Sequence, residues 1–184
     1  MAVLVIDNLS PFTPDILACL GRLQAPYVCK KFSEVSEQDV EKSERVILSG
    51  RRKNDPAINS ANSQVILQCH RLDKPLLGIC YGAEIIALTL GGTLRRMERR
   101  MHESIEIVPE KPNPLTDGKG SITVFESHGF CVARLPADLE RIAGSKYCEY
   151  EIFAHKNKRI FGTQFHPEKS GQDGMELIAN FMKT

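Results

Sequence analysis

One cysteine of this chain stands where a nucleophile would be presented to a ligand. Cys80 lies between Gly78 and Gly82, after an apolar run at residues 75–79 and before a helical pattern. Such a strand–turn–helix elbow exposes one side chain at the open end of a sheet. At a helix N-terminus, free N–H groups favour the thiolate, the form that attacks a carbonyl carbon. We therefore predict that Cys80 is a nucleophile, with an inert buried cysteine as the alternative.

A second segment, far along the chain, carries the groups that a thiol nucleophile needs. A strand predicted over residues 159–165 ends directly before His166, and Glu168 follows after Pro167. A histidine can act as the base, and a carboxylate can fix the tautomer of its imidazole. Each residue alone would suit an ordinary core or surface position. Together with Cys80, they predict a Cys80–His166–Glu168 triad.

The pattern of secondary structure explains how distant residues could meet. Strands and helices alternate with short links over the first 90 residues, which is typical of a parallel sheet covered by helices on both faces. We predict a three-layer, flavodoxin-like α/β fold with a mostly parallel central sheet, in one domain over residues 1–184. The expected strands cover 2–6, 26–30, 45–48 and 75–79, and the expected helices cover 13–23, 36–42, 58–71 and 82–90.

The pattern changes after Thr93 to short strands broken by a proline-rich stretch at residues 109–114. The expected strands are 103–108, 121–125, 130–132, 149–154 and 159–165, and a closing helix is expected at 174–182. The segment at residues 170–174 is expected to cap that helix, with a role of Ser170 in a substrate loop as the alternative. In an open parallel sheet, ligands bind at the carboxyl ends of the strands. Because Gly50, Cys80 and His166 all follow predicted strands, we expect them to converge in one cleft.

These motifs resemble the signatures of the class I, or triad, glutamine amidotransferases, and the resemblance covers nearly the whole chain. The G-x-C-x-G elbow around Cys80 and the F-H-P-E segment at residues 165–168 carry it. It implies a class I glutamine amidotransferase-like fold, with Cys80 as nucleophile, His166 as general base and acid, and Glu168 as its partner. Residues 46–50 resemble the strand and oxyanion loop of that family.

The resemblance also implies residues that surround the triad. The oxyanion-hole residues are Gly50, Arg51 and Tyr81, and the substrate-binding residues are Glu84, Ser127, His128 and Gly129. Two of them depart from the family pattern: Arg51 stands where a second glycine is usual, and Glu84 stands where glutamine is frequent. The basic run at residues 51–53 is either a docking surface or a solvated turn.

The reaction implied by the resemblance is hydrolysis of L-glutamine to glutamate and ammonia through a γ-glutamyl thioester. It needs no metal and no organic cofactor. The sequence has no P-loop pattern, so a separate ATP-dependent synthase subunit is expected to use the ammonia. Residues 126–168 look closest to the GMP synthase amidotransferase subunit, whereas residues 5–13 resemble the anthranilate synthase glutaminase component. A stand-alone γ-glutamyl hydrolase and a non-catalytic regulatory relative remain as alternatives.

Composition excludes other classes of protein. The 184 residues are 42% hydrophobic and carry a formal net charge of +1, which gives no general attraction to nucleic acid or acidic membranes. Six cysteines occur without a C-x-x-C pair or a zinc-ligand spacing, so reduced thiols and a cytoplasmic location are expected. The apolar start is interrupted by Asp7, as in a first strand rather than a signal peptide. A basic cluster at residues 95–100 lacks an aromatic platform and suggests a solvated or partner-facing segment.

Overall fold

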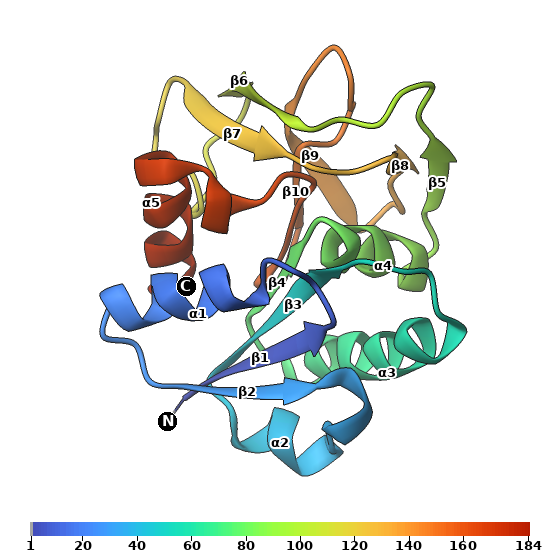
Figure 1. Ribbon diagram of the computed structural model, residues 1–184, viewed down its shortest axis with the longest axis vertical. Coiled ribbons are helices and arrows are strands. Elements are labelled where there is room, and N and C mark those ends of the chain that lie inside the picture. The colour runs from blue at the N-terminus through green and yellow to red at the C-terminus, as the bar shows by residue number, and fades with distance from the viewer. Residues whose placement is uncertain (1) are drawn as a thin grey trace.

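The computed structural model describes residues 2–184 and is built around one nine-stranded sheet (Figure 1). Five neighbouring strands run parallel, in the order β2 (Tyr27–Lys31), β1 (Val3–Asn8), β3 (Arg45–Arg51), β4 (Leu76–Ile79) and β11 (Ile160–Thr163). Four antiparallel strands extend it, in the order β10 (Ile152–His155), β9 (Leu139–Gly144), β6 (Glu103–Pro109) and β7 (Ile122–Glu126). A separate two-stranded sheet pairs β5 (Thr93–Arg96) with β8 (Phe130–Arg134).

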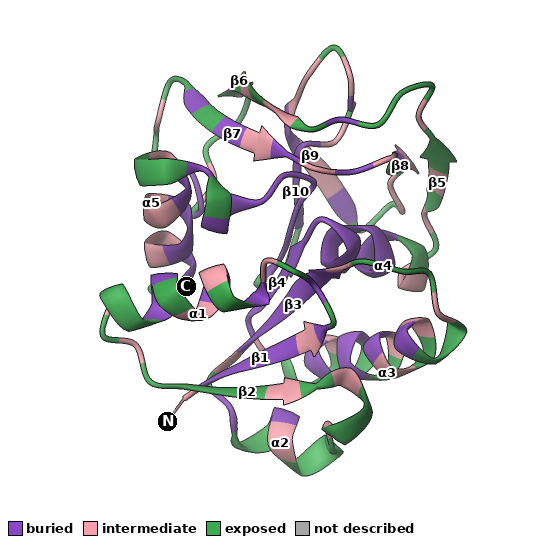
Figure 2. Cartoon of the chain, viewed as in Figure 1, coloured by how far each residue is buried: buried purple, intermediate pink, exposed green. Residues whose placement is uncertain are grey.

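Helices cover both faces of the parallel strands. On one face lie α1 (Thr13–Arg22) and α5 (Gly171–Phe181), and on the other lie α2 (Glu37–Lys42), α3 (Pro56–Leu72) and α4 (Tyr81–Thr89). Successive side chains of a strand point to opposite faces, so Val3 and Val5 of β1 pack with the first layer and Leu4 and Ile6 with the second. Two short 3-10 helices cover Phe32–Glu34 and Pro167–Lys169. The central strands and α4 are almost entirely buried (Figure 2).

The predicted α/β fold is confirmed, including the flavodoxin-like order of its parallel strands. Two strands were not predicted. β5 is a four-residue strand with two arginines, and three of its residues are exposed, so it carries little apolar pattern. In β9, buried and exposed residues do not alternate regularly, since two partly exposed residues follow each other between buried ones. The predicted strand 149–154 begins only at Ile152, and the predicted strand 159–165 is regular only from Ile160 to Thr163.

A buried hydrogen-bond network fixes the strand ends that carry the site. The Asn8 N–H donates to Ser49 Oγ at 2.9 Å, and the Asn8 side chain donates to the Ser49 carbonyl at 3.1 Å. The Asn62 side chain donates to Asn8 Oδ1 at 2.6 Å. These bonds join β1, β3 and α3 next to Gly50. Among residues 2–184, no helix has both the length and the apolar character that a bilayer crossing requires.

Candidate active site

Cys80 lies at the elbow between β4 and α4, as the sequence predicts. Its backbone has φ 52° and ψ −107°, a conformation that is unfavourable for a residue with a side chain. Its N–H donates to the Thr163 carbonyl at 2.7 Å, which ties the elbow to β11. The elbow is tightly packed: a Cβ on Gly82 would come within 2.5 Å of the Leu48 carbonyl oxygen. Only glycine allows α4 to begin this close to β3.

His166 and Glu168 lie together after β11. His166 Nδ1 is 2.8 Å from Glu168 Oε1, and both side chains are almost completely buried. The His166 N–H donates to the Phe125 carbonyl at 2.9 Å. The Ser170 hydroxyl donates to the His166 carbonyl at 2.6 Å and accepts the Phe125 N–H at 2.9 Å. Ser170 occupies the N-cap position of α5, as predicted, but its side chain makes no cap bond and its hydroxyl holds the His166 backbone instead.

The nucleophile and the imidazole meet beside Gly50. A Cβ on Gly50 would lie 3.1 Å from His166 Cε1 and 3.8 Å from Cys80 Cβ, so both side chains line the space above the end of β3. The two side chains are close enough for each to shift the pKa of the other. The three residues that the sequence places far apart therefore come together at one edge of the sheet.

The protonation states of Cys80 and His166 depend on each other. Burial raises the pKa of the Cys80 thiol, and the neighbouring His166 acts in the opposite direction. For His166, burial disfavours the charged form, but Cys80 and Glu168 outweigh it and hold the imidazole pKa well above its usual value. We expected the helix N-terminus to favour the thiolate. Burial has the larger effect, so the pKa of the Cys80 thiol is raised overall. The thiolate is stabilised chiefly as an ion pair with His166.

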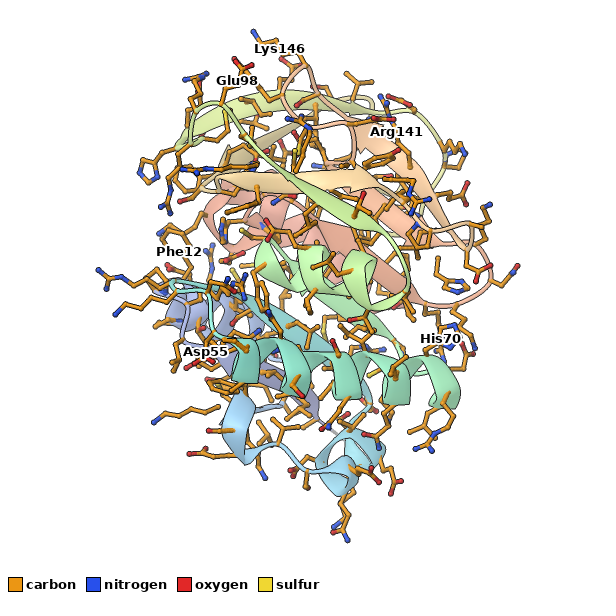
Figure 3. All side chains as sticks on the ribbon, turned by 90° about the vertical axis from the view of Figure 1, so that its right-hand side faces the viewer. Phe12, Asp55, His70, Glu98, Arg141 and Lys146 are labelled. Carbon is orange, nitrogen blue, oxygen red and sulfur yellow. The ribbon has the colours of Figure 1, made fainter. Side chains whose placement is uncertain are left out.

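One aromatic ring that the sequence analysis did not single out packs against the imidazole. The Phe12 ring lies edge-on to the His166 ring, with 4.8 Å between centroids, and Phe125 lies 6.3 Å from Phe12. Figure 3 shows Phe12 and Asp55 on the same side of the molecule, away from His70. Phe12 thus forms one wall of the site beside the imidazole.

Gly50 and Arg51, two of the predicted oxyanion-hole residues, are the last two residues of β3. The Arg51 guanidinium lies 3.9 Å above the Tyr81 ring and donates to Asn59 Oδ1 at 2.7 Å. The Tyr81 hydroxyl donates to the same oxygen at 2.8 Å. Arg51 is therefore held by α3 and α4, whereas Arg52 and Lys53 of the same basic run are exposed. Asn59, which organises this contact, was not predicted.

Glu84 lies one turn into α4, directly below the nucleophile. Its N–H donates to the Cys80 carbonyl at 3.0 Å, and its carboxylate accepts the Gln164 side-chain N–H at 3.1 Å. Burial raises the pKa of the Glu84 carboxyl. The structure thus places Glu84 near Cys80 but already paired, with Gln164 as a partner that the sequence did not suggest.

The segment Ser127–Gly129 lies against the nucleophile. The Ser127 carbonyl oxygen is 4.0 Å from Cys80 Sγ. The carbonyls of His128 and Gly129 accept backbone N–H groups from the β5–β6 connection, at 2.8 and 3.0 Å. The His128 ring is buried, and both its nitrogens have partners within the protein, so this segment offers its backbone to a ligand rather than the imidazole. Within residues 2–184, no three His, Cys, Asp or Glu side chains are grouped to hold a metal ion.

Comparison with known proteins finds one family and relatives whose names agree with it. The profile of the family described as "Glutamine amidotransferase class-I" matches residues 4–184. The chain is 32% identical to a protein of Methanosphaera stadtmanae that is named as one subunit of glutamine-hydrolyzing GMP synthase, over 100% of this chain and 97% of that protein. It is also 32% identical to the glutamine-hydrolyzing GMP synthase of Escherichia coli, over 75% of this chain but 28% of that longer protein.

Solved structures show the same fold. A crystal structure from Thermoplasma acidophilum, described as that of a GMP synthase subunit, superposes with a TM-score of 0.89 and 26% identity, over 100% of this chain and 92% of that one. A glutamine amidotransferase from Thermotoga maritima superposes with a TM-score of 0.79 and 20% identity, over 100% of this chain and 83% of that one.

Proposed function

Because this chain belongs to the class I glutamine amidotransferase family and is a glutamine-hydrolysing enzyme, we propose that Cys80, His166 and Glu168 are its catalytic triad. One observation carries the assignment: the His166 ring is hydrogen-bonded to Glu168 and lies with Cys80 in the space beside Gly50. A thiol, a base and an orienting carboxylate in this order are what nucleophilic acyl transfer requires.

The proposed reaction begins with attack of the Cys80 thiolate on the carboxamide carbon of glutamine. A C–S bond forms, and the electron pair of the C=O double bond moves to the oxygen. We assign the stabilisation of that oxyanion to N–H groups of Gly50, Arg51 and Tyr81, and each such donor contributes about 3 kcal/mol to barrier lowering. His166 protonates the departing nitrogen as the C–N bond breaks, and ammonia leaves. His166 then takes a proton from water, which attacks the thioester and releases glutamate.

We assign the binding of the glutamine main-chain groups to the segment Ser127–Gly129 and to Glu84. The segment lies beside Cys80 Sγ and presents polar backbone groups. Glu84 would attract the substrate ammonium, but its carboxylate is bonded to Gln164. Because Gln164 bonds to only one of the two Glu84 oxygens, the other oxygen is the one assigned to the substrate ammonium.

For the ammonia, we propose a separate ATP-dependent synthase subunit that forms GMP, and a cytoplasmic location. The support comes from the relatives' names and lengths. The Methanosphaera protein that this chain matches almost end to end is named as one subunit of the synthase. The Escherichia coli protein, of which the matched region covers only 28%, is named as the whole synthase.

The experiment combines the purified chain with candidate synthase subunits from the same cell and supplies amide-labelled glutamine. We expect glutamine hydrolysis to rise when the synthase subunit is added, with label in GMP. Label in anthranilate would instead assign the chain to the anthranilate type. Full activity without any partner, with preference for γ-glutamyl peptides over glutamine, would replace the proposal by a stand-alone γ-glutamyl hydrolase.

A methyl group at position 50 should disturb the catalytic histidine. In Gly50→Ala the new methyl would lie 3.1 Å from His166 Cε1, so the imidazole must shift by a few tenths of an ångström. We expect kcat for glutamine hydrolysis to fall about tenfold, because small misplacements of catalytic groups are costly. Gly21→Ala is the matched control, since a Cβ there meets nothing within 4 Å. Equal kcat values in the two variants would show that the approach of Gly50 to His166 is unimportant.

A further inference from the structure

Two buried carboxyl groups lie behind the active site and take no part in the reaction described above. Glu126, the last residue of β7, and Glu151, just before β10, are both 0% exposed. No amide or hydroxyl donor of residues 2–184 satisfies either oxygen of Glu126 or Oε2 of Glu151. The groups that face these oxygens are the imidazole of His128 and the two carboxyls themselves. Buried carboxylates without donors are rare, so this arrangement requires an explanation.

The geometry sets the number of protons in the cluster. His128 Nδ1 is 2.7 Å from the Phe130 carbonyl oxygen, which can only accept, so Nδ1 carries a proton. His128 Nε2 is 2.8 Å from Glu126 Oε2, and these two atoms need a proton between them. Glu126 and Glu151 interact in the interior with oxygens that no amide or hydroxyl satisfies, and one further proton held between the two carboxyls would satisfy an oxygen of each. The imidazole and the two carboxyls are then neutral as a group.

The cluster connects two segments that line the active site. Through His128 it holds the segment Ser127–Phe130, whose Ser127 carbonyl lies 4.0 Å from Cys80 Sγ. Through the backbone of Glu151 it reaches Gln164, whose N–H donates to the Glu151 carbonyl at 2.8 Å two residues before His166. The Ser145 hydroxyl donates to Glu151 Oε1 at 2.6 Å and fixes the far side of the pair.

We propose that Glu126 and Glu151 are positioning residues that share a proton and, through His128, hold the segment Ser127–Phe130 in its glutamine-binding place opposite Cys80. This inference rests on the proposed function for its effect on catalysis. Loss of the shared proton would leave two negative charges in contact in the interior, and their repulsion would displace the end of β7 and the segment that follows it.

The surroundings agree with a proton held near neutral pH. Burial raises the pKa of Glu126 to about 7, and burial together with the charge of Glu126 raises the pKa of Glu151 to about 8. His128 and His166 act in the opposite direction, because a positive imidazole favours ionised carboxyls. The other titratable or charged groups around the cluster are Cys80, Glu84, Arg95, Cys131 and Cys148.

The test compares the wild type with Glu126→Gln and Glu151→Gln, because an amide mimics a protonated carboxyl but has no proton to lose. For the wild type, we expect KM for glutamine to rise about tenfold between pH 6.5 and 8.5, beyond any change in kcat. In each glutamine variant, KM should stay within about threefold of the wild-type value at pH 6.5 and remain flat. Glu140→Gln, at a surface carboxyl paired with Lys111, is the control and should keep the wild-type profile.

A second readout does not depend on catalysis. The infrared band of a protonated carboxyl should be present at pH 6, weaken by pH 9, and be reduced in the double variant Glu126→Gln/Glu151→Gln. If the chain does not hydrolyse glutamine, only the KM measurement fails and the band still reports the shared proton. A wild-type KM profile that Glu126→Gln leaves unchanged, or a band equal in the double variant and the wild type, would overturn the proposal.

Discussion

Glutamine hydrolysis by Cys80→Ala is expected to fall by a factor of about 10⁴ or more, because no other group at the site can form the thioester. Loss of a nucleophile in a catalytic triad has effects of about 10⁶ in well-studied hydrolases. The fold should persist, since alanine keeps the Cβ and the N–H that donates to Thr163. Glutamate release measures the activity, and thermal unfolding measures the fold.

Cys29→Ala serves as the matched control for that experiment. Cys29 lies on β2 at the edge of the sheet and is exposed, whereas Cys80 is buried at the elbow. This variant should retain wild-type activity. Activity of Cys80→Ala within tenfold of the wild type would contradict the triad assignment. If that variant unfolds, loss of wild-type activity on alkylation of the Cys80 thiol replaces it as the test.

For His166→Asn, we expect glutamine hydrolysis to fall by about 10³, within the range that general acid–base catalysis contributes. The loss has a second cause. His166 opposes the effect of burial on the pKa of Cys80, so its removal should raise that pKa further and make the thiolate scarcer. Alkylation of Cys80 by iodoacetamide as a function of pH tests this, and its midpoint should move to higher pH.

His70→Asn provides the comparison for the histidine variant. His70 lies near the end of α3, on the opposite side of the molecule from Phe12 (Figure 3). Its replacement should change neither the rate nor the alkylation profile. A lost rate with an unchanged alkylation profile in His166→Asn would show that His166 acts on the substrate but does not stabilise the thiolate.

The parallel half of the fold, and the segments that carry the proposed triad, were predictable because their signals are local. The buried strand at 76–79, the elbow glycines and the apolar helix that follows are contiguous in the sequence, and the segment at 165–168 is equally compact. Convergence of Cys80 and His166 then follows from the rule that parallel strands end at the same edge. β5 and β9 escaped prediction because they gain their order from pairing with β8 and β10 rather than from their own pattern.

The contacts around the triad could not be predicted from the sequence, because each joins residues whose proximity depends on the folded structure. Phe12 reaches His166 across the sheet edge, and Asn59 joins Arg51 to Tyr81 from a different helix. The pairing of Glu126 with Glu151 runs against expectation, since two carboxyls would ordinarily avoid a shared interior. Their contact appears only when β7 and β10 are placed in space.

At position 80, backbone conformation favours glycine, whereas the reaction requires cysteine. A residue other than glycine with φ 52° carries a conformational strain of about 1–3 kcal/mol, which the tight packing of the elbow sustains. Glycine would relieve that strain but would remove the sulfur. Relatives that no longer depend on the chemistry should therefore drift toward glycine at this position, and a cysteine retained there marks a lineage in which turnover is still under selection.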